Sequence, residues 1–364
     1  MSTTNDILGP LGTTTMRVIF LYVGQGEATL ALMPDGRGRH LSMLIDSNRG
    51  ASLKGIDLPK LLGDVLPKNS ESKPVLDVFA NTHPHSDHLG GLEDIRKAVH
   101  VGAVWHSGHK PSSAHEGPWG ELAALINEVK KRGGAEIRLE GSRTPSTWGS
   151  GDVHILSPAE YIVDEIENET PDQRDARIHD QCAVLRISYG GVAAKTHILI
   201  TGDSDKAAWK RITGYHGKPE DNRVRSHVLS ASHHGSYTFF KDRTDDPEPF
   251  EDHLTAIAPE RVIISAPDQK DSKHSHPDDD AVERYEKAVG KDFIHHMGSR
   301  GWSFFVDVFS DGNYTVGDDR GELARTFCFD ENKDGGDDGG GSGTKKAAPA
   351  VISRVERSRP MGEK

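Results

Sequence analysis

The feature that most constrains this chain is a cluster of potential metal ligands that follows an apolar run. Residues 75–79 (Val-Leu-Asp-Val-Phe) are typical of a buried strand. Residues 81–91 then read Asn-Thr-His-Pro-His-Ser-Asp-His-Leu-Gly-Gly. Four potential ligands fall within six positions of this stretch: His83, His85, Asp87 and His88. Residues 92–99 carry apolar side chains at helical spacing, so we expect the cluster in a loop between a strand and a helix, where rigid elements hold functional groups.

The spacing within the cluster has a chemical reason. In extended chain His83 and His85 point the same way, so both imidazoles can bind one cation. Asp87 and His88 follow after the chain begins to turn, and we expect them to hold a second ion. Two divalent ions about 3.5–4 Å apart are the usual means of activating water for hydrolysis. The alternative is a surface loop that is His-rich by chance, but the order of the ligands and the flanking elements favour a metal site.

A carboxylate in an earlier part of the chain is a candidate partner for this cluster. Asp46 ends the apolar run 41–45, so it is expected at a strand end. There it could accept the ring N–H of a metal-bound imidazole and thereby fix the tautomer of that ring. The alternative is an aspartate that starts a turn.

Length and composition limit the classes of protein to which this chain can belong. The 364 residues suffice for one large or two ordinary domains. The formal charge of −12 predicts no broad basic surface for nucleic acid, although bound divalent ions would add positive charge locally. Two cysteines, Cys182 and Cys328, are too few for a disulfide framework. No signal peptide is evident and no apolar run approaches the roughly 20 residues that span a bilayer, so we expect a cytoplasmic protein without membrane contact.

The chain divides into three parts. Residues 1–15 predict a flexible lead-in, residues 16–329 a single folded domain, and residues 330–364 a flexible tail, Gly/Asp-rich and then basic, that can recruit a protein partner. The charged residues 161–178 indicate a surface insertion or lid. Strands are expected at residues 16–22, 29–32, 41–45, 75–79, 103–105, 153–156, 197–201, 228–232, 261–266, 302–308 and 314–316. Helices are expected at residues 58–66, 92–99, 121–132 and 278–289.

The order His-x-His-x-Asp-His resembles the signature of the metallo-β-lactamase superfamily. Other stretches resemble the branch typified by the hydrolase domain of the ComEC DNA-uptake proteins and by bacterial phosphorylcholine esterases. These stretches are residues 23–28 (Val-Gly-Gln-Gly-Glu-Ala), 179–185 (His-Asp-Gln-Cys-Ala-Val-Leu), 233–236 (His-His-Gly-Ser) and 276–277 (His-Pro). The chain departs from that branch at Tyr22, Glu27, His179 and Cys182, where relatives have Asp, Asp, Asn and Ser. It also lacks the Asn that usually precedes the His-Pro pair.

The resemblance implies an α/β fold, a four-layer αββα sandwich with two metal ions between the sheet edges. It implies the following ligand set: His83, His85, Asp87, His88, Asp180, Asp203 and His234. Asp203 is expected to bridge both ions, because an anionic bridge offsets the repulsion between two dications. Asp180 is expected to act as a ligand or as a group that positions water, and whether His179 supplies the ligand instead is open. Spacing does not decide between His233 and His234, and we favour His234, with His233 facing substrate.

The resemblance also assigns residues around the metals. Gln25 and Glu27 are expected near the ions, although a Gly-Gln-Gly-Glu turn is more often a hairpin. Ser236 is a candidate hydrogen-bond donor to an anionic substrate, or a turn residue. His276 is a candidate substrate contact or general acid, or a cap for the helix that follows it.

The function that these features imply is metal-assisted hydrolysis with two divalent ions, Zn²⁺ or Mn²⁺. Asp87, His233 and His276 are the candidate catalytic residues. A phosphodiesterase acting on DNA or RNA is the first hypothesis. The second is a hydrolase of a small phosphoester, lactone or thioester. The third is a metal-binding scaffold that has lost activity and recruits a partner through its tail.

Overall fold

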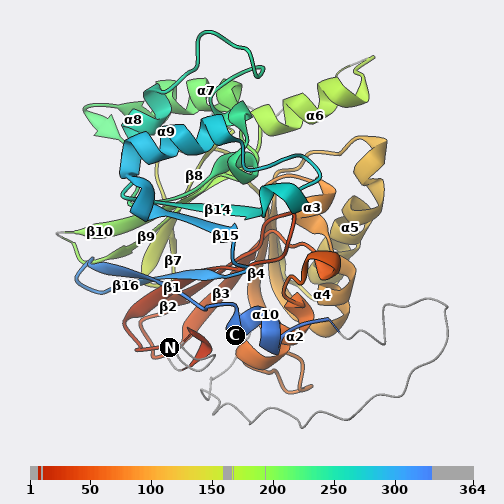
Figure 1. The fold of residues 1–364 in the computed structure, drawn as a ribbon. Helices are drawn as coiled ribbons and strands as arrows, with labels where there is room; N and C mark the ends of the chain where they lie inside the picture. The colour runs from red at the N-terminus through yellow and green to blue at the C-terminus, as the bar shows by residue number, and fades with distance from the viewer. Residues whose placement is uncertain (1–6, 10, 159–165, 167, 193, 330–364) are drawn as a thin grey trace.

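Two large β-sheets face each other, with helices on both outer sides (Figure 1). The computed structural model describes residues 7–9, 11–158, 166, 168–192 and 194–329. The four-layer αββα class expected from the sequence is therefore confirmed. The tail at 330–364, residues 1–6 and 10 of the lead-in, and residues 161–165 and 167 of the expected lid lie outside the described residues. None of the helices in the described ranges has the length and hydropathy needed to cross a bilayer.

The first sheet has eight strands in the order β17-β16-β1-β2-β3-β4-β5-β6. Its strands are β1 (Thr15–Phe20), β2 (Thr29–Pro34), β3 (His40–Ile45), β4 (Val75–Asn81), β5 (His100–His106), β6 (Ala135–Arg138), β16 (Phe304–Phe309) and β17 (Tyr314–Asp318). Neighbours from β17 to β3 are antiparallel, and those from β3 to β6 are parallel.

The second sheet has seven strands in the order β15-β14-β13-β10-β9-β8-β7. Its strands are β7 (Ser146–Trp148), β8 (Gly151–Ser157), β9 (Val184–Gly190), β10 (Lys195–Ile200), β13 (Val228–Ser230), β14 (Arg261–Pro267) and β15 (Ile294–Gly298). Neighbours from β7 to β10 are antiparallel, and those from β10 to β15 are parallel. The short strands β11 (Gly217–Lys218) and β12 (Asp221–Asn222) form a separate hairpin.

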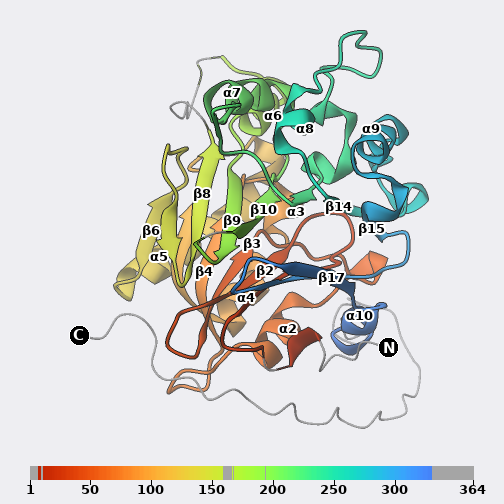
Figure 2. The same cartoon turned by 90° about the vertical axis from the view of Figure 1, so that its left-hand side faces the viewer.

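Helices cover the outer face of each sheet and also line the edge where the sheets meet (Figures 1 and 2). The α-helices are α2 (Leu58–Val65), α3 (Ser86–Leu89), α4 (Leu92–Ala98), α5 (Glu116–Lys131), α6 (Pro171–Asp180), α7 (Lys206–His216), α8 (Asp252–Ile257), α9 (Asp279–Val289) and α10 (Glu322–Thr326). The short 3₁₀ helices are η1 (Ala51–Leu53), η2 (Ser113–His115), η3 (Ser232–Gly235), η4 (Tyr237–Phe239), η5 (Gln269–Asp271) and η6 (Lys291–Phe293).

Alternating side chains of the strands fill three separate apolar layers. In β1, Val18 and Phe20 pack between the two sheets, whereas Ile19 packs against the helices outside the first sheet. A third layer joins the outer face of the second sheet to α7, α8 and α9. Each fully buried Leu, Ile or Phe contributes about 1.5–3 kcal/mol. Because both faces of each sheet are buried, the strands read as apolar runs, which is why the sequence reveals them.

Two helices that flank the site were not predicted from the sequence. In α6 half of the residues are charged, so no apolar stripe marks it, although Thr170 and Gln173 form a capping box at its start. In α7 the side chain of Asp205 caps the N-terminus, and Trp209 and Ile212 supply the buried face. The capping residues were the available signal in both cases.

We expect Trp209→Ala to lower the free energy of unfolding by about 3–5 kcal/mol, because it leaves a cavity in the third apolar layer. Trp209 is fully buried, stacks edge-on against Phe239 and donates through Nε1 to Ser204 Oγ at 2.8 Å. Chemical denaturation measures the change. The control is Tyr215→Ala on the same helix, where the side chain is 48% exposed and the expected loss is below about 1 kcal/mol.

Candidate metal centre

The candidate ligands lie at one shared edge of the two sheets because they follow the carboxyl ends of parallel strands. His83 and His85 follow β4 and lead into α3, which carries Asp87 and His88. Asp203 follows β10, and His234 lies in η3 after β13. Strands β10 and β13 are parallel neighbours, so their ends meet. Backbone contact between the sheets fixes the edge, since Ala183 N donates to Thr82 O at 3.0 Å.

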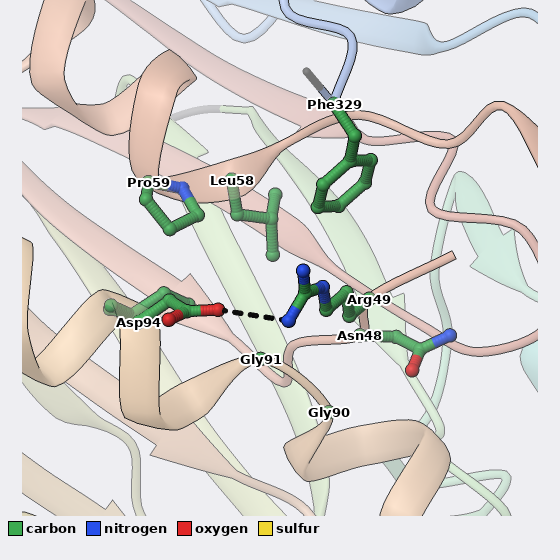
Figure 3. A pocket seen from close by; sticks show the side chains of 9 residues that line it. Asn48, Arg49, Leu58, Pro59, Gly90, Gly91, Asp94 and Phe329 are labelled. Atoms are coloured by element: carbon green, nitrogen blue, oxygen red, sulfur yellow. Dashed lines mark hydrogen bonds and ion pairs between the residues drawn. The ribbon is translucent and has the colours of Figure 1, made fainter. Parts of the chain in front are cut away.

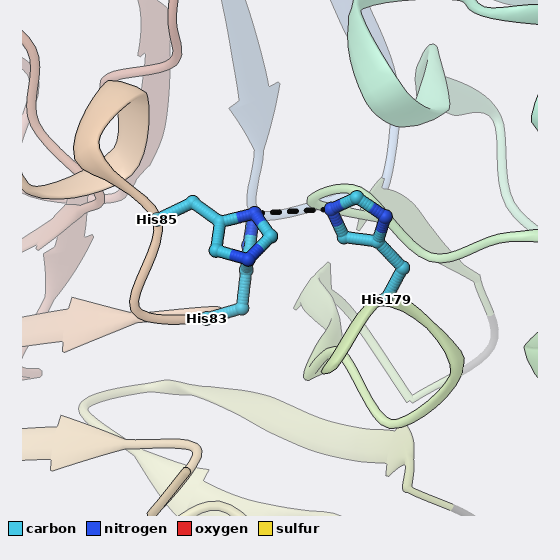
Figure 4. A group of neighbouring side chains, drawn as sticks. All are labelled: His83, His85 and His179. Atoms are coloured by element: carbon cyan, nitrogen blue, oxygen red, sulfur yellow. Dashed lines mark hydrogen bonds between the residues drawn. The ribbon is translucent and has the colours of Figure 1, made fainter. Parts of the chain in front are cut away.

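A first donor group consists of three histidines, His83, His85 and His179 (Figure 4). One ring nitrogen from each lies within 4.8 Å of the others. His85 Nδ1 lies 3.1 Å from His179 Nε2, and the rings of His83 and His85 are 4.6 Å apart between centroids. His83 and His85 come from the loop after β4, whereas His179 comes from the last turn of α6. Three imidazoles are a common ligand set for Zn²⁺.

A second donor group lies beside the first and consists of Asp87, His88, Asp203 and His234. His88 Nε2 lies 3.1 Å from Asp203 Oδ1, and His234 Nε2 lies 3.3 Å from Asp87 Oδ2. Asp203 also faces the first group, with Oδ2 at 3.6 Å from His83 Nε2 and 4.0 Å from His179 Nε2. The carboxylate of Asp203 therefore lies between the two groups.

The donor atoms of both groups fit bound cations because they are buried without adequate partners. Within the described residues, Nε2 of His83, His88 and His234 and Oδ1 of Asp203 are buried and make no hydrogen bond of acceptable geometry. Buried polar atoms without partners are costly and rare. A cation in each group would satisfy these atoms together, so the residues present fit two divalent ions.

The electrostatics of the protein alone show how strongly this edge attracts positive charge. Burial would raise the pKa of Asp203, but the neighbouring histidines His88, His233 and His234 hold it well below its usual range. Burial would lower the pKa of His234, yet Asp203 and Asp87 raise it to about 9. Protons on histidine therefore hold the positive charge that the carboxylates require.

The first donor group is electrostatically different. Burial and the neighbouring histidines lower the pKa of His83 and His179 well below the ordinary value. Neutral imidazole is the form that binds metal. His83 and His179 therefore present nitrogen lone pairs, whereas the second group contains two carboxylates.

Hydrogen bonds on the far side of the rings fix the orientation of the ligands. His88 Nδ1 donates to Asp46 Oδ2 at 2.8 Å, and Asp46 also accepts from Thr82 N at 2.8 Å and Thr82 Oγ1 at 2.6 Å. His234 Nδ1 donates to Ser265 O at 2.7 Å. These bonds leave Nε2 of both histidines free to face the centre. Asp46 thus occupies the supporting position predicted for it, in the left-handed region with a φ of 57°.

A glycine pair after the ligands allows the chain to turn tightly. A Cβ on Gly90 would lie 2.3 Å from Asn48 Oδ1, and Gly91 has a φ of 73°, which favours glycine. Asn48 and these glycines also line a small hollow on the outer side of the turn (Figure 3). There Arg49 pairs with Asp94 at 3.5 Å. This hollow contains no member of either donor group.

The structure does not bring Asp180 into either donor group. Its carboxylate forms an ion pair with Arg211 of α7. The preceding residue, His179, lies in the first group instead. Neighbouring residues of a helix project about 100° apart, so only one of the two can face the centre.

The remaining predicted residues surround the centre at different depths. His233 Nε2 lies 3.6 Å from Asp203 Oδ2, and its Nδ1 lies 2.9 Å from Thr238 Oγ1. The ring of His276 lies 5.5 Å from that of His233. His233 thus faces the centre beside His234, and His276 lies one ring further out.

Two predicted residues have structural partners of their own. Ser236 caps η4 by accepting from Thr238 N at 3.3 Å, which is the turn role considered as its alternative. Gln25 Oε1 accepts from Ser272 Oγ at 2.9 Å.

Glu27 lies beneath the second donor group. It is buried beside Asp46 and His88, and Ser230 Oγ donates to its Oε1 at 2.7 Å. Burial raises the pKa of Glu27.

Sequence reasoning missed two residues beside His85. The ring of His115 stacks on the His85 ring at 4.4 Å between centroids. Asp175 of α6 lies 3.4 Å from His85 Nε2 through its Oδ1. The signal that could have revealed Asp175 is its spacing of four residues from His179, which places both on one helix face.

We expect Asp203→Ala to lower the affinity for both metal ions by at least about 100-fold, because its carboxylate faces both donor groups. Equilibrium dialysis with Zn²⁺ followed by elemental analysis measures the bound equivalents. The matched control is Asp180→Ala, which removes a carboxylate outside both donor groups. This variant is expected to bind both metal ions as the native protein does. Loss of metal in Asp180→Ala would instead support Asp180 as a ligand.

Several solved structures are similar to this chain at low sequence identity. One similar solved structure is Igni18, a novel metallo hydrolase from the archaeon Ignicoccus hospitalis KIN4/I, with 14% identity and a TM-score of 0.39, covering 84% of this chain and 99% of that one. Another is a diphosphatase from the PhnP family, with 12% identity and a TM-score of 0.36, covering 84% and 98%. A long form RNase Z from yeast shows 12% identity and a TM-score of 0.34, covering 70% and 38%.

A comparison with curated proteins gives no match. The family model that matches is described as the Metallo-beta-lactamase superfamily, and it covers residues 63–208. This segment carries all of the three-histidine group and every member of the second group except His234. Residues 63–208 therefore match the Metallo-beta-lactamase superfamily over the part of the chain that supplies most of the metal centre.

Proposed function

We propose that this protein is a hydrolase that uses two divalent metal ions to cleave phosphodiesters, with DNA or RNA as the first candidate substrates. The observation that supports the proposal is the pair of donor groups that share the Asp203 carboxylate. When bound, the two ions supply an activated water and stabilise the negative charge that develops on the substrate. Such a pair suits phosphodiesters, since the attacking and leaving oxygens both carry charge.

The residues of the chain divide this work between them. His83, His85 and His179 would hold one ion, and Asp87, His88, Asp203 and His234 the other. Asp46 and Ser265 O keep the rings of His88 and His234 in place through their Nδ1 atoms. A fixed arrangement of this kind avoids reorganisation during the reaction.

Two further histidines are candidates for contact with the substrate. The side chain of His233 is 21% exposed and lies 3.6 Å from Asp203, so it borders the centre and solvent at once. His276 lies beside it and pairs with Asp278 at 3.4 Å through Nδ1. We propose that these imidazoles bind or protonate the substrate once it is held at the centre.

The charge distribution favours a second candidate, a small phosphoester. Arg211 of α7 pairs with Asp180, directly after the ligand His179. Arg174 and Arg177 of α6 both pair with Glu169. Carboxylates neutralise these cations, and the net charge of the chain is −12. A long polyanion such as DNA depends on many unpaired cations for binding, so this charge distribution favours a compact substrate.

We expect metal-dependent cleavage when the purified protein is incubated with single- or double-stranded DNA or RNA and Mn²⁺ or Zn²⁺. An Asp203→Ala preparation serves as the control for contaminating nuclease, and gel electrophoresis reports the products. Cleavage of a small phosphoester but not of DNA or RNA would favour the second candidate. Bound metal without hydrolysis of any phosphoester would contradict the proposal and favour a binding scaffold.

Asp87→Ala and His88→Ala are each expected to lower the hydrolysis rate by at least about 100-fold, because each removes a donor from the second group. The secondary structure should be retained, since both residues lie in the short helix α3 at the sheet edge rather than in an apolar layer. Circular dichroism checks the fold beside the rate measurement. Full activity in both variants would contradict the two-metal proposal.

A further inference from the structure

The carboxylate of Asp175 lies against the outer side of the ligand His85. Asp175 Oδ1 lies 3.4 Å from His85 Nε2. The other ring nitrogen of His85, Nδ1, lies 3.1 Å from His179 Nε2. Asp175 and His179 are both in α6, four residues apart and therefore on one face of the helix. One helix thus contacts both nitrogens of the same imidazole.

Neighbouring side chains hold Asp175 and His85 in this arrangement. Its Oδ1 is buried and, like His85 Nε2, makes no hydrogen bond of acceptable geometry, whereas Oδ2 accepts from Ser112 Oγ at 3.3 Å. The ring of His115 stacks on His85 with an interplanar angle of 23° and accepts from Ser86 N at 3.1 Å through Nδ1. The His85 ring is therefore restrained on its face by His115 and at Nδ1 by His179, and the Asp175 carboxylate lies beside its Nε2.

We infer that Asp175 is a positioning residue that accepts the Nε2–H of His85 and so directs the Nδ1 lone pair toward the cation of the three-histidine group. Neutral imidazole carries one proton, so a hydrogen bond at Nε2 decides that Nδ1 is the free donor. This role rests on the metal centre of the proposed function. It extends the supporting arrangement, because His88 is fixed by Asp46 and His234 by Ser265 O.

A third cation between His85, His115 and Asp175 is the competing interpretation, since their ligand atoms lie within 4.8 Å of one another. It would require His85 to bind metal through both ring nitrogens, and a neutral imidazole has only one lone pair for this purpose. The positioning role needs only one lone pair on the His85 ring.

The inference gives α6 a specific part in assembling the centre. The helix supplies the third ligand, His179, together with the carboxylate that orients the second, His85. Because His179 and Asp175 belong to the same helix, the packing of α6 against the loop that contains Ser112 completes the three-histidine group. Arg174 of the same helix donates to Pro111 O at 3.5 Å, which reinforces this packing.

The test measures Zn²⁺ affinity and stoichiometry by competition with a chromophoric chelator, so it does not depend on hydrolysis. We expect Asp175→Ala to weaken one of two bound equivalents by about 10- to 100-fold and to leave the other unchanged. Asp175→Asn keeps an acceptor oxygen and should recover part of the affinity. The matched control is Asp172→Asn, an exposed aspartate in the first turn of α6, which should bind as the native protein does.

A second readout follows the tautomer of His85 directly. Long-range ¹H–¹⁵N spectra of histidine side chains should show the proton on Nε2 of His85 in the native protein and a mixture in Asp175→Ala. Native affinity for both equivalents in Asp175→Ala would overturn the positioning role while leaving the proposed function intact. Three equivalents in the native protein and two in the variant would overturn it in favour of a third cation. A native protein that binds no Zn²⁺ would overturn both the role and the proposed function.

Discussion

The carboxylate of Asp203 is the constraint on which the rest of the site depends. It is almost fully buried, and five imidazoles lie within 4.0 Å of its oxygens: His83, His88, His179, His233 and His234. A buried anion is tolerated only when positive charge or hydrogen bonds offset the loss of water. The surrounding histidines and the cations they would hold provide that offset, so the sheet edge is organised around one negative charge.

The architecture makes such a costly site possible. Three apolar layers hold the two sheets and their helices rigidly, and the ligands follow the ends of strands that those layers fix. Supporting bonds then set each ring, from Asp46 to His88 and from Ser265 O to His234. Without that rigidity, the unpartnered nitrogens would relax toward water or toward one another, and the geometry for metal binding would be lost.

The sequence predicted the strands and helices that have a clear pattern of apolar residues. Most of the strands buried on both faces were predicted because apolar residues dominate them, as in 75–79, where only Asp77 is charged. The helix α5, with Leu122 and Leu125 on its buried face, was predicted in its core and begins five residues earlier than expected. Helix α6 was missed because half of its residues are charged and ion pairs rather than an apolar stripe hold it.

The sequence by itself determined the kind of chemistry, because ligand types at spacings of one or two residues have local geometry: His83 and His85 on one side, Asp87 and His88 after the turn. It could not decide between His179 and Asp180, since the choice depends on how α6 is rotated against the sheet edge. Nor could it reveal that Asp175 reaches His85 from 90 residues away. Only the tertiary structure brings α6 to that ring, because the contact depends on packing between distant segments rather than on local backbone geometry.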